Sequence, residues 1–139
     1  NTGKRRHGKE PGSCLNCGEK LDTSSKKYCS HKCFHEYRYK ETIADWKKGK
    51  AISRKYGHTP ATLRRYLFEK HHNSCQECSW NMVNPTTGLV PLQVHHKDGN
   101  CENNREENLE LLCPNCHSLT STFGGLNGAG KGRRKKGLM

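Results

Sequence analysis

The stretch of sequence that decides the fold lies at residues 94–117 and reads VHHKDGNCENNREENLELLCPNCH. It opens on two adjacent histidines, His95 and His96, and passes through a polar segment in which asparagines are frequent. A short apolar run, a Cys-x2-Cys pair and a third histidine, His117, complete it. Metal-ligating side chains and signals for short structural elements therefore coincide in one segment, and the rest of the chain is interpreted around it.

Short elements are predicted on both sides of a turn, which residues 98–100 (DGN) signal. Before the turn, residues 89–95 (LVPLQVH) favour a strand, with Pro91 at an edge position because proline cannot donate to a sheet ladder. After the turn, Leu109 to Leu112 favours a second short strand. Pro114 then favours the start of a helix that continues through the last histidine and beyond.

Eight of the nine cysteines fall into two quartets with zinc-site spacing. The quartets are Cys14-x2-Cys17-x11-Cys29-x3-Cys33 and Cys75-x2-Cys78-x34-Cys113-x2-Cys116. Zinc binds four soft ligands in a tetrahedron, and a Cys-x2-Cys turn supplies two thiolates from one tight knuckle, which Gly18 after Cys17 accommodates well. We predict two structural zinc ions. Neither is predicted to be catalytic, because four cysteines leave no open position for water or substrate.

Other cysteine and histidine assignments stay open at this point. Chance placement or disulfides are the alternatives to zinc. His31 and His35 lie close to the first quartet and could replace one of its thiols as a ligand, although we favour four cysteines. His71 and His72 are interpreted as ordinary basic residues, and Cys101, the ninth cysteine, as a free thiol in a loop.

Composition explains why metal is needed. The chain has 139 residues, of which 30% are hydrophobic, and its mean hydropathy is −1.07. A globular domain usually carries about 45–50% apolar residues, so one ordinary core is not expected to hold the whole chain. No apolar stretch resembles a signal peptide or approaches the ~20 residues of a membrane span. These features predict an intracellular, cytoplasmic protein that does not bind a membrane.

A net charge of +12 favours a polyanionic partner. Nucleic acid is preferred to an anionic membrane, because no long basic helix with a broad apolar face is present. The alternative is a basic surface that serves only solubility. Residues expected to contact DNA lie on a helix and in the C-terminal tail; they are Arg64, Arg65, Lys70, Arg133, Arg134, Lys135 and Lys136.

Two helices are predicted before the second quartet. Ser30 can cap the first, which Gly49 would end. The second should begin near Pro60, a favourable first-turn residue, and run through TLRRYLFEKHH. Its buried stripe would consist of Leu63, Tyr66 and Leu67.

Residues 75–123 resemble the HNH (ββα-metal) nuclease family. The resemblance rests on His95-His96, on Asn108-Leu109 and on His117, with flanking Cys-x2-Cys pairs that match the zinc-stapled branch of the family. It implies metal-dependent hydrolysis of DNA phosphodiester bonds, leaving 5′-phosphate and 3′-hydroxyl ends. Compact proteins of this kind resemble homing or restriction endonucleases, which phages and mobile elements often encode.

The predicted fold is small, α+β and zinc-stabilised: a ββα-metal nuclease domain preceded by a four-cysteine zinc finger and helix. The expected organisation is a basic flexible arm at 1–13, the finger and its helix at 14–47, a basic linker at 48–60, the nuclease domain at 61–123 and a Gly-rich basic tail at 124–139.

The resemblance also implies a role for each residue of the motif. His96 would be the general base, and Asn108 would orient its imidazole through the side-chain carbonyl. His95 and His117 would bind the catalytic divalent ion. Many family members carry Asp at the position of His95, so the ion's identity stays open: Mg²⁺ prefers oxygen, whereas Mn²⁺, Ni²⁺ or Zn²⁺ accepts nitrogen more readily. Asp98 is a rival ligand.

The chemistry accounts for these residue types independently, because hydrolysis needs a base near neutral pKa and a cation at the leaving oxygen. Neighbours on a regular strand point to opposite faces, however. An irregular backbone before Gly99 would bring His95 and His96 to one site. As alternatives, Asn108 could be a turn residue, and His117 could be a partner of the second zinc site.

Two other functions fit the same residues. A non-catalytic zinc protein that binds nucleic acid would share the cysteines and the charge, and an RNA nuclease would share the catalytic residues. One active site cuts one strand, so a double-strand break would need a homodimer or two visits.

Overall fold

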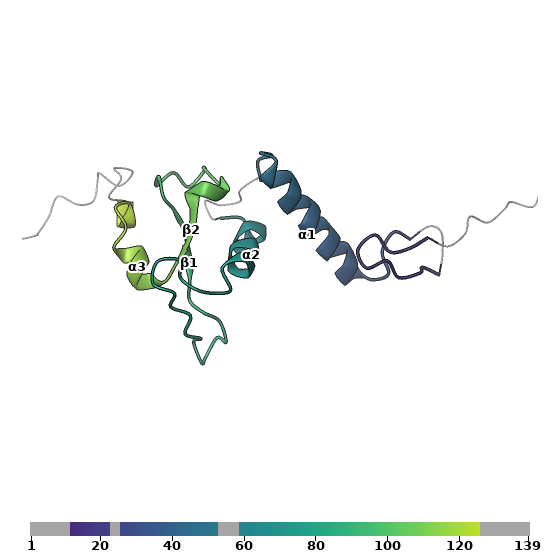
Figure 1. Cartoon of the computed structure of the whole chain (residues 1–139), viewed down its shortest axis with the longest axis horizontal. Coiled ribbons are helices and arrows are strands. Elements are labelled where there is room, and N and C mark those ends of the chain that lie inside the picture. The colour runs from purple at the N-terminus through teal and green to yellow at the C-terminus, as the bar shows by residue number, and fades with distance from the viewer. Residues whose placement is uncertain (1–11, 23–25, 53–58, 126–139) are drawn as a thin grey trace, which may run out of the picture. The chain divides into compact units, whose positions relative to one another are not determined.

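The computed structural model describes residues 12–22, 26–52 and 59–125. The chain divides into two compact units, Asn1–Asp45 and Trp46–Met139. Helix α1 (His31–Lys47) follows the first cysteine quartet, and its last two residues belong to the second unit. Figure 1 shows the order of the elements along the chain.

The first unit is a cysteine knuckle followed by α1. Gly18 has a φ of +77°, as the turn after Cys17 requires, and an isolated bridge joins Ser13 to Lys20. The Ser30 hydroxyl accepts a hydrogen bond from the Cys33 backbone N–H at 3.2 Å. The N-cap predicted for this helix is therefore confirmed.

The end of α1 also agrees with its prediction. Gly49 has a φ of +94° and donates its backbone N–H to the Trp46 carbonyl at 2.8 Å. Among the described residues of the first unit, the buried apolar side chains are few: Cys14, Leu21 and Ile43. A core of this size cannot offset the entropy of ordering the segment, so another stabilising element is needed.

In the second unit, α2 (Ala61–Lys70) begins directly after Pro60. Leu63 and Leu67 are buried, at 0% and 1% exposure, and Tyr66 is half-buried. The predicted stripe is confirmed. The remaining elements are β1 (Gln93–His96), the 3₁₀ turn η1 (Glu106–Asn108), β2 (Leu109–Leu112), α3 (Pro114–Ser118) and the 3₁₀ turn η2 (Phe123–Gly125).

Strand β1 begins later than predicted. The expected strand covered 89–95, but pairing starts at Gln93. Val90 and Leu92 are buried in the core without belonging to the strand, and Pro91 between them is exposed. Burial of apolar side chains from an irregular segment leaves the same sequence signal as a strand, which explains the error.

Strands β1 and β2 form an antiparallel pair with Gln93 opposite Leu112 and His96 opposite Leu109. Figure 1 shows α3 and α2 flanking this pair, and both helices contact it. The core cluster behind the strands consists of Cys75, Val90, Leu92, Leu111, Leu112 and Cys113. Two cysteines of the second quartet are thus part of the core. Within the described part of the chain, no helix has the length and apolar character of a membrane span.

Candidate metal centres and active site

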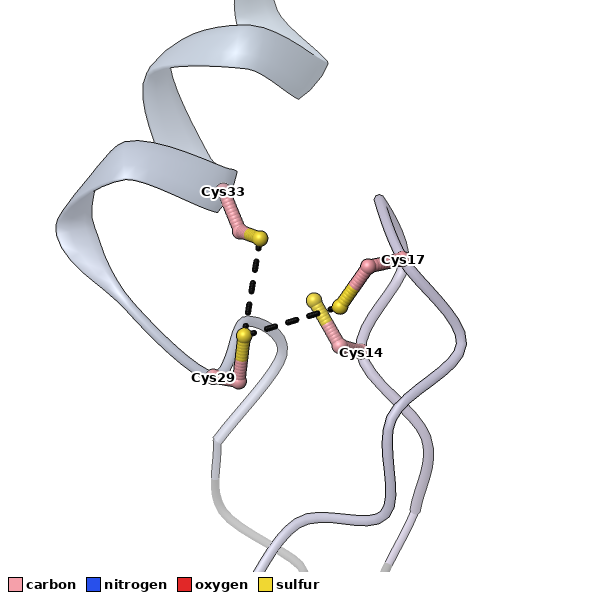
Figure 2. A group of neighbouring side chains, drawn as sticks. All are labelled: Cys14, Cys17, Cys29 and Cys33. Carbon is pink, nitrogen blue, oxygen red and sulfur yellow. Dashed lines mark hydrogen bonds between the residues drawn. The ribbon is translucent and has the colours of Figure 1, made fainter.

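The first cysteine quartet converges on one point (Figure 2). The sulfur atoms of Cys14, Cys17, Cys29 and Cys33 all lie within 4.8 Å of one another. The Cys17–Cys29 and Cys29–Cys33 sulfur separations are 3.6 and 3.5 Å. A tetrahedral zinc with Zn–S bonds of about 2.3 Å places its sulfurs about 3.8 Å apart, whereas a disulfide places them at about 2.05 Å. The spacing fits a metal ion.

The second quartet has the same geometry and joins distant segments. The sulfurs of Cys75, Cys78, Cys113 and Cys116 lie within 4.8 Å of one another, and the Cys78–Cys113 separation is 3.7 Å. The Cys116 backbone N–H approaches the Cys113 sulfur at 3.4 Å. A metal ion here would link two segments that are distant in the sequence. One follows α2 and precedes the strand pair, and the other is the start of α3, after the strand pair.

The pKa values of the thiols in both quartets favour binding of a cation. Burial raises the pKa of Cys14 and Cys75, but hydrogen bonds from nearby backbone N–H groups outweigh it, so that their pKa values are about 6 and about 7. Hydrogen bonds with neighbouring thiols of each quartet raise the pKa of Cys29 and Cys116 well above the ordinary thiol range. Four thiols this close cannot all ionise alone, and a bound divalent cation would remove that conflict.

The other candidate ligands lie elsewhere. The Nε2 atoms of His31 and His35 contact each other at 3.2 Å on the exposed face of α1. Neither imidazole belongs to the four-sulfur group, which consists of the four cysteines and could hold a metal ion. Cys101 is exposed and lies outside both quartets.

Two imidazoles, one buried on β1 and one half-buried on α3, meet between the sheet and α3. The rings of His95 and His117 are 5.2 Å apart at 65°, and His95 is 8% exposed. Thr122 Oγ1 is 3.5 Å from His95 Nε2, and the Phe123 ring packs edge-on against His117 at 5.4 Å. The Nδ1 atom of His117 is buried and has no hydrogen-bond partner among the described residues.

These two rings fit a nitrogen-coordinated ion. Burial lowers the pKa of His95, with the nearby His117 adding to the effect, and burial alone lowers the pKa of His117. Both rings are therefore neutral at neutral pH and present lone pairs. An unpartnered buried nitrogen costs about 1–3 kcal/mol, which a bound cation at His117 would offset.

His96 points away from this pair. Strand β1 is regular through His96, and the ladder continues beyond it with the Lys97 N–H donated to the Asn108 carbonyl at 2.9 Å. The irregular backbone that would bring both histidines to one face is not formed. Successive side chains alternate, so His95 lies on the α3 side and His96 on the other. His96 Nε2 lies 3.0 Å from Asn104 Oδ1.

Asn108 makes a different set of contacts from the one predicted. Its side-chain oxygen accepts the Asp98 backbone N–H at 3.1 Å, and its Nδ2 donates to Asp98 Oδ1 at 2.9 Å and to the Asn103 carbonyl at 2.8 Å. With 7% exposure, Asn108 holds the loop between the strands. Asn104, rather than Asn108, contacts the His96 imidazole.

Asp98 is committed to the same loop. Its carboxylate accepts hydrogen bonds from Asn103 Nδ2 at 2.7 Å, from the Asn100 backbone N–H at 2.8 Å and from Asn108. These bonds, led by the one from Asn103, lower the pKa of Asp98. The carboxylate is therefore ionised and already well bonded, which makes it a weaker candidate than the two imidazoles for a metal ligand.

The chain matches two known proteins over part of its length. It is 48% identical over 58 residues to H-N-H endonuclease F-TflIV of Escherichia phage T5, a match covering 40% of this chain and 23% of that protein. This part of the chain resembles an HNH endonuclease. A second match, 29% identical over 115 residues, is to Zorya protein ZorE of Escherichia coli and covers 75% of this chain and 30% of that protein.

The chain thus spans less than a third of the length of either curated relative. No family model and no solved structure matches it. Together with the two four-cysteine groups, the phage match fits the zinc-stapled branch of the HNH endonucleases that the motif resembles.

Basic residues of α2 that were expected to face DNA have partners within the protein. Arg64 donates from Nη2 to the Leu92 carbonyl at 3.1 Å, Arg65 pairs with Glu69 at 2.7 Å, and Lys70 pairs with Glu106. All three residues are nevertheless exposed. The tail residues Arg133, Arg134, Lys135 and Lys136 lie outside the described residues.

Proposed function

We propose that this chain is a metal-dependent DNA endonuclease that hydrolyses phosphodiester bonds through a ββα-metal domain. The observation that carries the proposal is the close pair of imidazoles at the buried His95 and the half-buried His117, with His96 as the residue that follows His95 in the same strand. The identity with a phage protein named an H-N-H endonuclease supports the same activity. The order β1, β2, α3 matches what the proposed fold requires.

Each cysteine quartet would hold one structural zinc ion. Sulfur separations of 3.5–3.7 Å support a tetrahedral ion of this size. Filled quartets have no open coordination position, so their contribution is to folding rather than to chemistry.

A separate divalent ion would be held by His95 and His117. When bound, it supplies positive charge at the leaving oxygen of the scissile phosphate. Two neutral imidazoles favour Mn²⁺, Ni²⁺ or Zn²⁺ over Mg²⁺, which prefers oxygen ligands.

His96 would take the proton of the attacking water. The side-chain oxygen of Asn104 is an acceptor, so the hydrogen bond between them requires the proton of the neutral ring to be on Nε2. The lone pair is then on Nδ1, which is the atom that acts as the base. Asn108 and Asp98 support this arrangement by holding the loop that carries Asn104.

Substrate placement must satisfy both faces of the strand. In the described part of the chain, β1 pairs with β2 alone, so its other edge is free. A phosphate bound across this edge would be within reach of His95 from one face and of His96 from the other. The net charge of +12, the finger and the basic segments would hold the rest of the DNA. Cutting both strands would need a homodimer or two visits.

A plasmid assay tests the proposal. The purified chain is incubated with supercoiled plasmid and Mn²⁺, Ni²⁺ or Mg²⁺, beside an EDTA control and a single-stranded RNA of similar length. We expect nicked or linear DNA with Mn²⁺ or Ni²⁺ and none with EDTA. Cleavage of the RNA alone would make the chain an RNA nuclease. If the chain binds DNA but does not cleave it with any of the three ions, it is a non-catalytic zinc protein that binds nucleic acid. Such a protein would still be intracellular or phage-encoded.

A further inference from the structure

We propose that Trp46, which lies outside the HNH-like segment, is a positioning residue for His96 and acts through Asn104. The inference rests on the proposed function, because it concerns the residue assigned as the base. It adds a side chain from the end of α1 to a site otherwise built from the strands and the loop between them.

Asn104 is the residue through which Trp46 would act. The Trp46 indole N–H donates to the Asn104 backbone carbonyl at 2.7 Å, while the Asn104 side-chain oxygen lies 3.0 Å from His96 Nε2. One residue therefore connects the indole to the imidazole. Trp46 is 7% exposed, so its N–H is shielded from water and the bond is stronger than it would be on the surface.

Trp46 is itself held in place. Its ring packs edge-on against Tyr66 of α2 at 5.4 Å, and the Tyr66 hydroxyl donates to Glu106 Oε1 at 2.7 Å. The Lys47 ammonium lies 4.6 Å from the centre of the Tyr66 ring. The indole that donates to Asn104 is thus restrained by its contact with α2.

Packing alone does not hold Asn104. Asn104 belongs to no helix or strand, and an open cleft lined by Trp46, Ala51 and Glu102 lies against this part of the loop. Two bonds within the loop hold the peptide that joins Asn103 to Asn104: the Asn104 N–H donates to the Glu102 carbonyl at 3.0 Å, and the Asn103 carbonyl accepts Asn108 Nδ2 at 2.8 Å. The indole bond restrains the next peptide, whose carbonyl oxygen belongs to Asn104. A small loss of alignment in a base lowers the rate.

The first test needs no catalysis. Trp46→Phe keeps an aromatic ring against Tyr66 but removes the N–H, and Trp80→Phe makes the same change elsewhere in the unit. Imidazole ¹⁵N spectra, with His96 assigned by His96→Ala, report which ring nitrogen carries the proton. We expect the Nε2–H form in wild type and in Trp80→Phe, and a mixture of both forms in Trp46→Phe. An unchanged His96 spectrum in folded, zinc-replete Trp46→Phe would overturn the proposal.

Kinetics separate positioning from binding. Loss of one neutral hydrogen bond of about 1 kcal/mol corresponds to a roughly 5-fold fall in kcat, with KM for DNA unchanged and Trp80→Phe equal to wild type. A fall through KM alone would contradict the proposal. If no chain cleaves DNA, the proposed function fails and the spectra still decide the role of Trp46.

A third measurement covers the case in which Trp46→Phe does not fold. In wild type, the Trp46 indole N–H should exchange with solvent much more slowly than an unprotected indole, and Asn104→Ala should shift the His96 proton to both ring nitrogens. Rapid exchange at Trp46, or no change at His96 in Asn104→Ala, would refute the connection.

Discussion

At His96 a neutral imidazole can carry its proton on either nitrogen, and the neighbouring side chain selects one. Asn104 Oδ1 lies 3.0 Å from Nε2, which keeps the proton there and leaves Nδ1 as the acceptor. Asn108 acts at a distance from the ring, through three hydrogen bonds that hold the loop. The two asparagines should therefore have separable effects when they are replaced.

We predict that Asn104→Ala lowers the single-turnover cleavage rate about 10-fold and changes the melting temperature little, because the side chain is half-buried and orients the base. Asn108→Ala should lower the melting temperature as well, since it removes the hydrogen bonds of Asn108 to the Asp98 N–H, to the Asp98 carboxylate and to the Asn103 carbonyl, at a cost of about 1–3 kcal/mol. Rates and thermal melts of both variants check this. Equal melting temperatures would contradict the division of roles.

The three histidines could be named as candidate site residues from the sequence, but Asn104 could not. Four asparagines, Asn100, Asn103, Asn104 and Asn108, crowd the segment between the two strands. Which of them meets the imidazole depends on how the loop turns back to β2, and residue type carries no signal for that. The opposite facing of His95 and His96 could be anticipated, because it follows from the alternation of any regular strand.

Among the elements, α1, α2, β2 and α3 could be predicted because their signals are local. Ser30, Pro60 and Pro114 mark helix starts by capping or by the missing N–H of proline. The start of β1 could not, since Val90 and Leu92 are apolar for reasons of core packing. Pairing between strands is a long-range property that an apolar run does not specify.

The contact of α2 with η1 predicts a pH-dependent stability. The hydrogen bond from Lys70 lowers the pKa of Glu106, and Tyr66 adds a second bond. A folded-state pKa below the unfolded value of about 4.3–4.5 gives stability that is present above that pH and is lost as the pH falls through the folded pKa.

We therefore expect Glu106→Gln to lower the free energy of unfolding by about 0.5–1 kcal/mol at neutral pH, the modest value reflecting partial exposure of the pair. In acid well below the folded pKa, the variant and wild type should converge. Denaturant melts at several pH values measure both. Glu107→Gln, at the exposed neighbouring position, is the control, and a difference that persists in acid would contradict the assignment.

Loss of zinc from one quartet should leave the zinc of the other quartet bound. Cys14→Ser should reduce the zinc content from two ions to one and unfold the first unit, which has few other buried side chains. Cys113→Ser should destabilise the proposed nuclease unit more than Cys14→Ser does, because Cys113 and Cys75 belong to the core cluster of that unit. Zinc analysis after dialysis, together with thermal melts, gives the outcome. A wild-type value near one zinc per chain would remove one of the two sites.

For the whole molecule, charge should dominate binding. With a net charge of +12, neutralising each phosphate of duplex DNA contributes roughly −0.9 to the slope of log K against log salt. Deleting residues 131–139, which carry Arg133, Arg134, Lys135 and Lys136, should flatten this slope. Fluorescence anisotropy over a range of salt concentrations measures it. An unchanged slope would mean that the tail contacts no phosphate.

The most direct test of the account compares His96→Ala with His95→Ala in DNA binding, zinc content and cleavage rate over a range of Mn²⁺ concentrations. Loss of a general base typically costs about 10²–10⁴ in rate. We predict that His96→Ala binds DNA, keeps two zinc ions and stays slow at every Mn²⁺ concentration, whereas His95→Ala recovers partly as Mn²⁺ rises. If His96→Ala cleaves like wild type while His95→Ala is inactive throughout, the roles of base and ligand are exchanged and the central claim is wrong.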